Sequence, residues 1–574
     1  MRLEDKIFAG IGMLKADTIL ENCRIVNVNT KEILAGDVAI KFGYIVGIGD
    51  VSELKGAQTH IVDINNRYLS PGLIDGHVHF ESSMVTLSQF TKVALAHGTT
   101  GVVIDPHEIA NVLGRQGIEL VLEEARTLPL NVFVTVSSCV PATVFETSGA
   151  KISAEDAEAL MDNDDVIGLA EMMDYPDVLR GDKEKIAMID AALKRRLLVD
   201  GHCPGLRGSK LGGYMCAGAS TDHESIEYEE ALEKLRLGMK LMVREGSAAK
   251  SLDSFLPRLI EDKISLENVF FITDDNHPGD LIHGYMDAIV KKAIILGLEP
   301  LDAISMCTTN TAKHYRIEHL VGSISIGRKA DFVILDNLEE FKIHSVFAGG
   351  TPIKTNKTVF SYPDHVFNTI KYKEIAAEDL QLIDIPEKTV PVNVIKVFPD
   401  KILTEMVKEE IKTDSQGFLV PDIEKDILST AVIERHGKNG NIGRGFITGL
   451  NLKSGALGQS IAHDSHNVIV TGTNYSDMAL CANTIRKMNG GIVLVQDNEV
   501  LDSLPLPFAG LLSMWPIEKV NNKLENMHET IRDMGCTLPA PFITHSFIAL
   551  PVIPDIRLTD MGLFDVKKFE LIIF

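Results

Sequence analysis

The feature that most constrains the fold of this chain is an alternation of short apolar segments with helical stretches between residues 69 and 319. Such alternation predicts parallel β/α units, because parallel strands need long crossover connections that are usually helices. Counting the segment that ends at His79, eight strands are expected, which is the closure number of a (β/α)8 barrel. The other seven are residues 101–105, 131–136, 166–171, 197–202, 219–223, 240–245 and 269–274.

Seven of these eight segments end in a polar or ionisable residue, and the third reaches Ser137 directly after its apolar run. In a (β/α)8 barrel the C-terminal ends of the strands face the active site. Side chains that are far apart in the sequence are therefore expected to meet there. The ionisable ones are His77, His79, Glu171, His202, His223 and Asp274.

His77 and His79 are separated by one residue on the first expected strand. Residues i and i+2 of a strand point to the same face, so the two imidazoles would project side by side while Val78 faces the packing. Two histidines at this spacing, without other candidate ligands, are common near ordinary turns. Joined by carboxylates from other strands, however, two imidazoles form a chelating site for a divalent transition metal.

Four histidines and two carboxylates are more ligands than one metal ion with open positions needs. The set suits two ions, with Glu171 placed to bridge them. Two such ions lower the pKa of a shared water molecule into the neutral range, which generates hydroxide.

The flanks of the expected barrel have β composition. Residues 1–68 contain several short β-rich runs, and residues 320–372 contain two more. We expect the two flanks to form one small β-sandwich around the catalytic barrel of residues 69–319. A charged, proline-containing connector near residues 374–391 leads into the last unit, residues 373–574, expected to be an additional C-terminal domain of mixed α and β structure. The predicted fold class is α/β.

Composition narrows the functional class. The net charge of -24 argues against a nucleic-acid binder, whose footprint would be basic. The seven scattered cysteines form no C-x-x-C pair, which is typical of a reducing compartment. No signal-peptide pattern and no membrane-length apolar run is visible, so we expect a cytoplasmic protein without a membrane partner. We also expect a homodimer or a higher homo-oligomer.

Several segments resemble a known superfamily. Residues 71–79 (PGLIDGHVH) resemble the first-strand signature of the amidohydrolase superfamily, and residues 322–334 resemble its post-barrel strand motif. More narrowly, residues 105–112, 168–173, 221–224 and 273–278 resemble the prokaryotic-type adenine deaminases, and residues 461–467 fit the extra domain of that family. Many superfamily members that open cyclic amides carry a carbamylated lysine at the bridging position, where this chain has Glu171.

The resemblance implies a ligand set and a reaction. His77 and His79 would bind one metal ion together with Asp274, Glu171 would bridge, and His202 and His223 would hold the second ion. The implied ions are Mn²⁺ or possibly Fe²⁺, two per chain. The implied reaction, a step of purine salvage, is the hydrolysis of adenine to hypoxanthine and ammonia by metal-activated hydroxide. Asp274 would take the proton from the attacking water and pass it to the departing amine.

The group that protonates the purine ring is left open. Related deaminases often carry a glutamate a few residues after the fifth-strand histidine, but here His202 is followed by Cys-Pro-Gly-Leu. His107, Glu108 and Glu245 are candidates for contacting the substrate, although each can equally be an ion pair or cap outside the site. Residues 463–466 (HDSH) form a possible second metal cluster, for which a hydrogen-bonded loop is the favoured interpretation.

Two alternatives accompany this interpretation. One is a related amidohydrolase acting on cyclic amides or on another aminopurine, and Glu171 in place of lysine disfavours the action on cyclic amides. A non-catalytic amidohydrolase-like scaffold is expected to have lost ligands, whereas this chain keeps all six.

Overall fold

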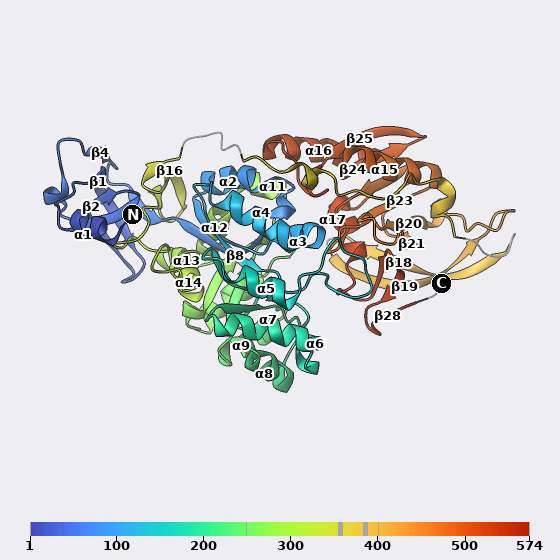
Figure 1. Cartoon of the computed structure of the whole chain (residues 1–574), viewed down its shortest axis with the longest axis horizontal. Helices are drawn as coiled ribbons and strands as arrows, with labels where there is room; N and C mark the ends of the chain where they lie inside the picture. Colours follow the sequence, from blue (N-terminus) through green and yellow to red (C-terminus); the bar gives the residue numbers. More distant parts are fainter. Residues whose placement is uncertain (1, 248, 354–359, 383–387, 400, 573–574) are drawn as a thin grey trace.

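Three parts follow one another along the molecule: a small β domain, a central barrel and a C-terminal domain (Figure 1). The computed structural model describes residues 2–247, 249–353, 360–382, 388–399 and 401–572. The barrel lies in the middle, so its two ends face different neighbours.

The barrel contains the eight parallel strands expected from the sequence. β6 (Leu73–His79), β7 (Thr99–Ile104), β8 (Asn131–Val136), β9 (Val166–Met172) and β10 (Leu198–Gly201) form one sheet, and β11 (Thr221–Asp222), β12 (Lys240–Arg244) and β13 (Val269–Ile272) form another. A parallel bridge between Val199 and Ala219 connects the two sheets on one side. On the other side β14 (Asp274–Asp275), which continues β13, pairs with β6 and closes the ring.

Helices surround this ring of strands. They are α2 (Leu87–Ala96), α3 (His107–Leu113), α4 (Arg115–Ala125), α5 (Ala154–Leu160), α6 (Tyr175–Arg180), α7 (Lys183–Lys194), α8 (Gly208–Cys216), α9 (Tyr228–Arg236), α10 (Leu252–Glu261), α11 (Pro278–His283), α12 (Met286–Ile295), α13 (Pro300–Met306) and α14 (Thr309–His314). α4 buries Ile118, Val121 and Leu122, a spacing that places one apolar stripe against the strands. α5 begins at a capping box in which Ser153 and Asp156 bond each other's backbone N–H groups.

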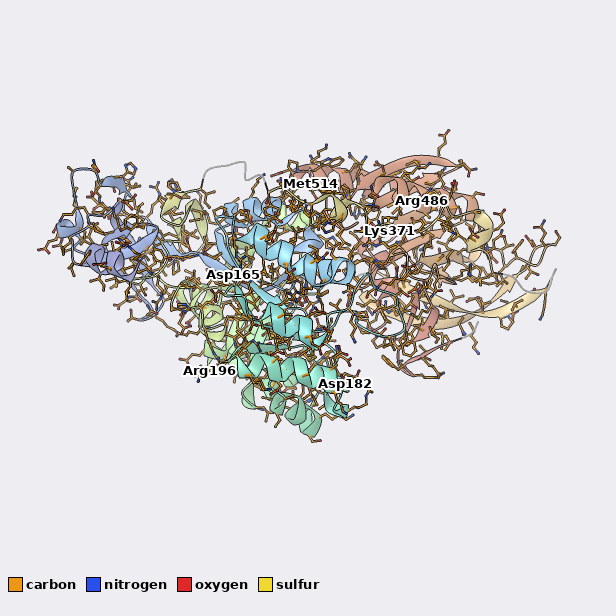
Figure 2. The ribbon with its side chains drawn as sticks, in the orientation of Figure 1. Asp165, Asp182, Arg196, Lys371, Arg486 and Met514 are labelled. Carbon is orange, nitrogen blue, oxygen red and sulfur yellow. The ribbon has the colours of Figure 1, made fainter. Side chains whose placement is uncertain are left out.

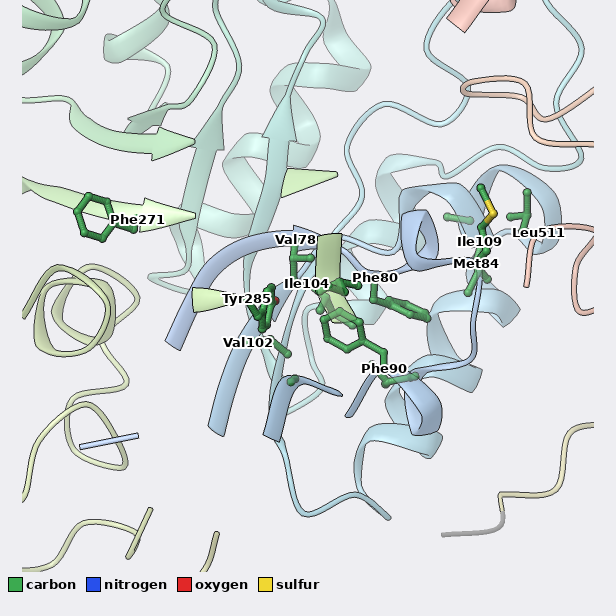
Figure 3. Packing of buried hydrophobic residues seen from close by; sticks show 14 of the residues in the cluster. Val78, Phe80, Met84, Phe90, Val102, Ile104, Ile109, Phe271, Tyr285 and Leu511 are labelled. Atoms are coloured by element: carbon green, nitrogen blue, oxygen red, sulfur yellow. The ribbon is translucent and has the colours of Figure 1, made fainter. Parts of the chain in front are cut away.

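The barrel strands are buried on both faces, as expected for a parallel sheet covered by helices. Every residue of β6 is buried. Figure 3 shows Val78 and Ile104 from neighbouring strands packed with Phe80, Phe90 and Tyr285. Burying a side chain of this size stabilises the fold by about 1.5–3 kcal/mol.

The small β domain combines both flanks of the barrel, as the sequence predicts. Its strands are β1 (Thr18–Asn27), β2 (Glu32–Lys41), β3 (Tyr44–Gly49), β4 (His60–Asp63), β5 (Tyr68–Pro71), β15 (Phe332–Asn337), β16 (Lys342–Ala348) and β17 (Thr351–Pro352). The sheet order is β17-β16-β15-β5-β1-β2-β3, with β4 beside β1. The antiparallel pair of β5 and β15 therefore joins the segments before and after the barrel. The N-terminal helix α1 (Leu3–Gly10) lies against β3.

The C-terminal domain is built on a sheet with the order β19-β18-β21-β20-β23-β22-β24-β25. These strands are β18 (Thr389–Phe398), β19 (Lys401–Lys412), β20 (Leu428–Ile433), β21 (Ile442–Thr448), β22 (Ala456–Gln459), β23 (Val468–Gly472), β24 (Gly491–Gln496) and β25 (Glu499–Pro505). α15 (Tyr475–Met488), α16 (Ile517–Asp533) and α17 (Pro541–Ser546) accompany it, followed by β26 (Ile556–Thr559), β27 (Gly562–Asp565) and β28 (Glu570–Leu571). The predicted connector falls partly on residues 383–387, which lie outside the described residues.

The cysteines and the lengths of the apolar helices bear on the expectations from composition. All seven cysteines are free, in agreement with the absence of a disulfide framework. Among the described residues, no helix combines the length and the apolar character needed to cross a bilayer.

The buried carboxylate of Asp75 ties the first barrel strand to the last. It accepts hydrogen bonds from the Tyr285 hydroxyl at 2.7 Å and from the Thr273 and His77 backbone N–H groups at 3.2 Å. The Thr273 hydroxyl donates to it as well. Asp75 therefore holds the closure of the barrel next to the histidine pair.

We predict that Asp75→Ala lowers the free energy of unfolding of the barrel by about 3 kcal/mol, because buried donors left without an acceptor cost about 1–3 kcal/mol each. Urea unfolding followed by circular dichroism measures this change. The control is Asp336→Ala, which removes a partly exposed ion pair with Arg67 and is expected to cost less than about 1 kcal/mol. Equal losses in the two variants would contradict a closing role for Asp75.

Candidate functional site

Two large cavities lie at opposite ends of the barrel. One of about 440 Å³ is lined by residues at the N-terminal ends of the strands, including Asp165 and Arg196. The other, of about 660 Å³, is lined by residues that follow the strands, including Asp182 and His202. Figure 2 places Asp165 and Arg196 toward the small β domain and Asp182 toward the C-terminal domain. The ionisable strand ends predicted from the sequence face the second end.

Glu171, at the end of β9, lies at the centre of these strand ends. Its Oε1 atom is 3.3 Å from His79 Nε2 and 3.9 Å from His77 Nε2. Asp274 Oδ1 is 3.1 Å from the same His79 nitrogen and 3.9 Å from that of His77. These four side chains thus converge on one point from β6, β9 and β14.

The second oxygen of Glu171 faces the other two histidines. Its Oε2 atom is 2.7 Å from His202 Nδ1 and 3.1 Å from His223 Nε2. The structure therefore brings together all six residues that the sequence predicts as ligands, and it divides them between the two oxygens of one carboxylate.

The donor atoms fit a pair of metal ions. Ligands bonded to one ion at about 2.0–2.2 Å lie about 3–4 Å apart, which matches the separations around Glu171. His77 Nε2 is buried and has no hydrogen-bond partner among the described residues, as expected of an atom that serves as a ligand. His79 Nδ1 lies 3.0 Å from the Asp105 carbonyl, and donating to that carbonyl leaves Nε2 free to bind.

Electrostatics also favour bound cations. Burial and the neighbouring His223 and His79 rings lower the pKa of His77 to about 4, so this imidazole stays neutral and able to bind a metal. Burial alone would lower the pKa of His223 as well, but contact with Glu171 raises it to about 9. The carboxylates thus draw positive charge into this pocket, which metal ions can supply.

Asp274 is held in an unusual conformation. Its φ angle of 64° is in the left-handed region, which is rare for residues other than glycine and clusters at functional sites. Burial opposes ionisation of its carboxyl, but Arg244 and His79 hold its pKa well below the usual range. Arg244 Nη1 is 2.5 Å from Asp274 Oδ2 and also contacts Glu224. Asp274 is therefore a carboxylate fixed in place by a buried guanidinium.

The three candidates for substrate contact have different surroundings. His107 lies in the site, with Nδ1 3.2 Å from Asp105 and 3.9 Å from Glu171 Oε1. Glu108 is next to it, 3.4 Å from His107 Nε2. Glu245 is not brought to the cluster, because its carboxylate forms an ion pair with Lys292 of α12 at 2.5 Å.

Two residues near the ligands were not assigned a role from the sequence. Glu224 Oε1 is 3.7 Å from His223 Nε2, and Arg244 links Glu224 to Asp274. Glu224 directly follows a predicted ligand and Arg244 lies at the end of the seventh expected strand, so strand-end position was an available signal for both. Because an arginine is not a metal ligand, a pattern of ligand residue types does not single out Arg244.

Comparison with known proteins gives a consistent result. The Amidohydrolase family profile matches residues 68–361, and the profile of the Adenine deaminase C-terminal domain matches residues 401–570. An adenine deaminase of Methanococcoides burtonii is 65% identical over 100% of this chain and 98% of that protein. One of Archaeoglobus fulgidus is 42% identical over 98% of this chain and 96% of its own length. A solved enamidase structure covers 58% of this chain and 95% of its own, with 17% identity and a TM-score of 0.46.

Replacing the central carboxylate tests the metal centre directly. We predict that Glu171→Gln, after loading with Mn²⁺, loses at least one bound ion per chain, because an amide offers a single oxygen and cannot bridge two cations. Elemental analysis of the folded protein measures the loss. Glu119→Gln, which removes an exposed carboxylate paired with Arg115, is the control and is expected to keep its metal content. Unchanged metal in the Glu171 variant would remove this residue from the centre.

Proposed function

The chain belongs to the amidohydrolase family and, within it, to the adenine deaminases, and we propose that it hydrolyses adenine to hypoxanthine and ammonia at the Glu171 centre. The observation that carries the proposal is the division of five ligands around Glu171. Two histidines and Asp274 face one oxygen, and His202 and His223 face the other. A scaffold without catalysis has no need for such a set, and the adenine deaminase domain match at residues 401–570 favours adenine over cyclic amides.

Two metal ions held by these residues would supply a water molecule whose pKa is lowered into the neutral range. Asp274 is placed to accept the proton of the attacking water. The C6–O bond forms in this step. Asp274 then passes the proton to the amino nitrogen as the C6–N bond breaks and ammonia leaves. Its ion pair with Arg244 fixes the Oδ2 atom, so that the Oδ1 atom remains directed at the histidines.

Glu224 is the acid we assign to proton exchange with a ring nitrogen of the purine. Glu171 and Asp274 are nearly buried and serve as ligands, and the carboxylate of Glu245 is paired with Lys292. The Glu224 side chain is 21% exposed, and its Oε1 atom lies 3.7 Å from His223 Nε2. Its ion-pair partner Arg244 also contacts Asp274, so this pair belongs to the site, unlike that of Glu245 and Lys292. Glu224 would thus take the place of the glutamate that is missing after His202.

The cavity of about 660 Å³ offers a route for the substrate, since small-molecule pockets commonly measure about 300–1,000 Å³. His202 is the predicted ligand that lines it, and its side chain is 22% exposed while those of the other five are at most 5% exposed. Met173, Pro176 and Pro204 line the same cavity, together with Phe569 of the C-terminal domain. Charged side chains, Asp174 and Lys185 among them, line it as well, so the cavity offers both apolar and polar contacts to a neutral planar base.

We further propose Mn²⁺ or Fe²⁺ as the working metal, a role in purine salvage and a cytoplasmic location. Free cysteines and the N/O ligand set are compatible with this assignment. We also propose a homodimer or higher homo-oligomer. Its support is an exposed apolar face at the N-terminus, where Leu3 and Ile7, four residues apart on α1, are 74% and 53% exposed.

Substrate profiling tests the proposed reaction. Protein purified with Mn²⁺ present is incubated with adenine, adenosine and a dihydropyrimidine, and ammonia release and ring opening are followed. We expect ammonia from adenine and neither reaction with the dihydropyrimidine. Deamination of adenosine without deamination of adenine would overturn the substrate assignment.

A second variant tests the ring acid. We predict that Glu224→Gln lowers kcat/KM for adenine by about 10²–10⁴-fold, the usual contribution of general acid–base catalysis, while bound metal is retained. Glu245→Gln is the matched control and is expected to keep the parent activity, because Glu245 pairs with Lys292. The reverse pattern, with Glu245 essential and Glu224 dispensable, would show that the assignment is wrong.

A further inference from the structure

A second cluster of metal-binding side chains lies between the barrel and the C-terminal domain. Glu108 belongs to α3 of the barrel, whereas His463 and His466 belong to the loop between β22 and β23. The donor atoms of these three residues lie within 4.8 Å of one another, and all three residues are buried. His463 Nδ1 is 2.9 Å from Glu108 Oε1, and His466 Nε2 contacts Glu108 Oε2.

Buried polar atoms crowd together at this place. Glu108 Oε2 and His466 Nε2, in residues that are only 2% and 1% exposed, contact each other and have no other hydrogen-bond partner among the described residues. Glu81 Oε2, in the turn after β6, is also buried without a partner there. Buried polar atoms without partners are rare, because each costs about 1–3 kcal/mol.

These side chains line one small cavity of about 20 Å³, together with His277. A space of this size is sufficient for a single water molecule or ion. Two carboxylates and three imidazoles around it form a set of nitrogen and oxygen donors typical of first-row transition-metal sites. Arg and Lys are absent from the lining residues, so within the described structure no fixed side-chain cation lines the cavity beside the two carboxylates.

We propose that Glu108, His463 and His466, with Glu81 and His277 beside them, bind a divalent transition-metal ion that fastens the C-terminal domain to the barrel. This ion is separate from those at Glu171, and the inference does not depend on the substrate. Glu81, Glu108 and His277 belong to the barrel, and His463 and His466 belong to the C-terminal domain. Binding of the ion by residues of both domains therefore requires the two domains to be docked.

Backbone and apolar contacts already join the barrel and the C-terminal domain around this cavity. Ser513 donates its backbone N–H to the Met84 carbonyl at 2.7 Å, and Val85 and Ser513 form a parallel bridge. Figure 3 shows Met84 and Ile109 of the barrel beside Leu511 of the C-terminal domain. Met84 and Leu511 also line the cavity, so apolar contacts surround its polar centre.

A hydrogen-bonded clamp is the competing arrangement. In it, a neutral His466 carries its proton on Nε2 and donates to Glu108. His466 Nδ1 accepts the Ala462 backbone N–H at 3.3 Å, which is compatible with this tautomer. The clamp, however, leaves the buried Oε2 atom of Glu81 without a hydrogen-bond partner among the described residues.

Metal stoichiometry separates the two arrangements. The full chain is dialysed against Zn²⁺ alone and its metal content is compared with that of His466→Asn. The expected result is a loss of one ion per chain in this variant and none in the control His528→Asn, which changes a histidine of α16 outside the cavity. Equal metal content in the parent and His466→Asn would overturn the proposal.

Two further measurements keep the result independent of folding and of the deaminase reaction. Anomalous diffraction from crystals of the parent grown with Zn²⁺ is expected to show a peak between Glu108 and His466, and a map without one would contradict the site. Glu171→Ala is expected to retain one tightly bound Zn²⁺ per chain. If that variant binds none, the interdomain site is excluded, whereas a lack of ammonia release from adenine would affect only the proposed function.

Discussion

The buried carboxylate of Glu171 is the group on which the rest of the site depends. A carboxylate that is 4% exposed is costly unless opposite charge or hydrogen bonds surround it. Its Oε1 atom contacts His79, and its Oε2 atom contacts His202 and His223. Charge compensation and ligand geometry are thus satisfied by the same atoms, which explains why strands from all around the barrel deliver histidines to one point.

Closure of the barrel makes this convergence possible. His77 and His79 end the first strand, and Asp274 follows the last, so these ligands are adjacent only if the first and last strands pair. Asp75 secures that pair by accepting bonds from Thr273 and Tyr285. Gly76 permits it, because a Cβ atom at this position would lie 2.7 Å from the Phe270 ring. The Asp and Gly that precede the histidines therefore serve the closure of the barrel, and this closure places the histidines beside Asp274.

The sequence predicts the barrel, and the meeting of the six candidate ligand side chains at its mouth, because both depend on local patterns. A buried parallel strand has an apolar run with a defined end, and each predicted ligand, such as Glu171 or His202, lies at or next to such an end. Residues that act across the structure leave no local pattern. Arg244 is important because its side chain meets Glu224 and Asp274, and Glu108 because residues 463–466 approach it from another domain. The histidines of that loop were visible in the sequence, but their partner was not, so a hydrogen-bonded loop was the favoured interpretation.

Buried carboxyl groups are found at the barrel mouth both around Glu171 and around Glu108, His463 and His466. Burial and the nearby Glu108 raise the pKa of Glu81 to about 8, and burial and Asp464 raise that of Glu146 to about 8. At both carboxyls burial outweighs the groups that favour the charged form, in contrast to Asp274, where Arg244 and the neighbouring histidines together outweigh it. The negative potential of Glu171, Asp105 and Glu108 favours mobile cations at this mouth. The proposed metal sites would therefore couple folding of the mouth to uptake of metal ions, and the C-terminal domain, by supplying His463 and His466, would take part in that coupling.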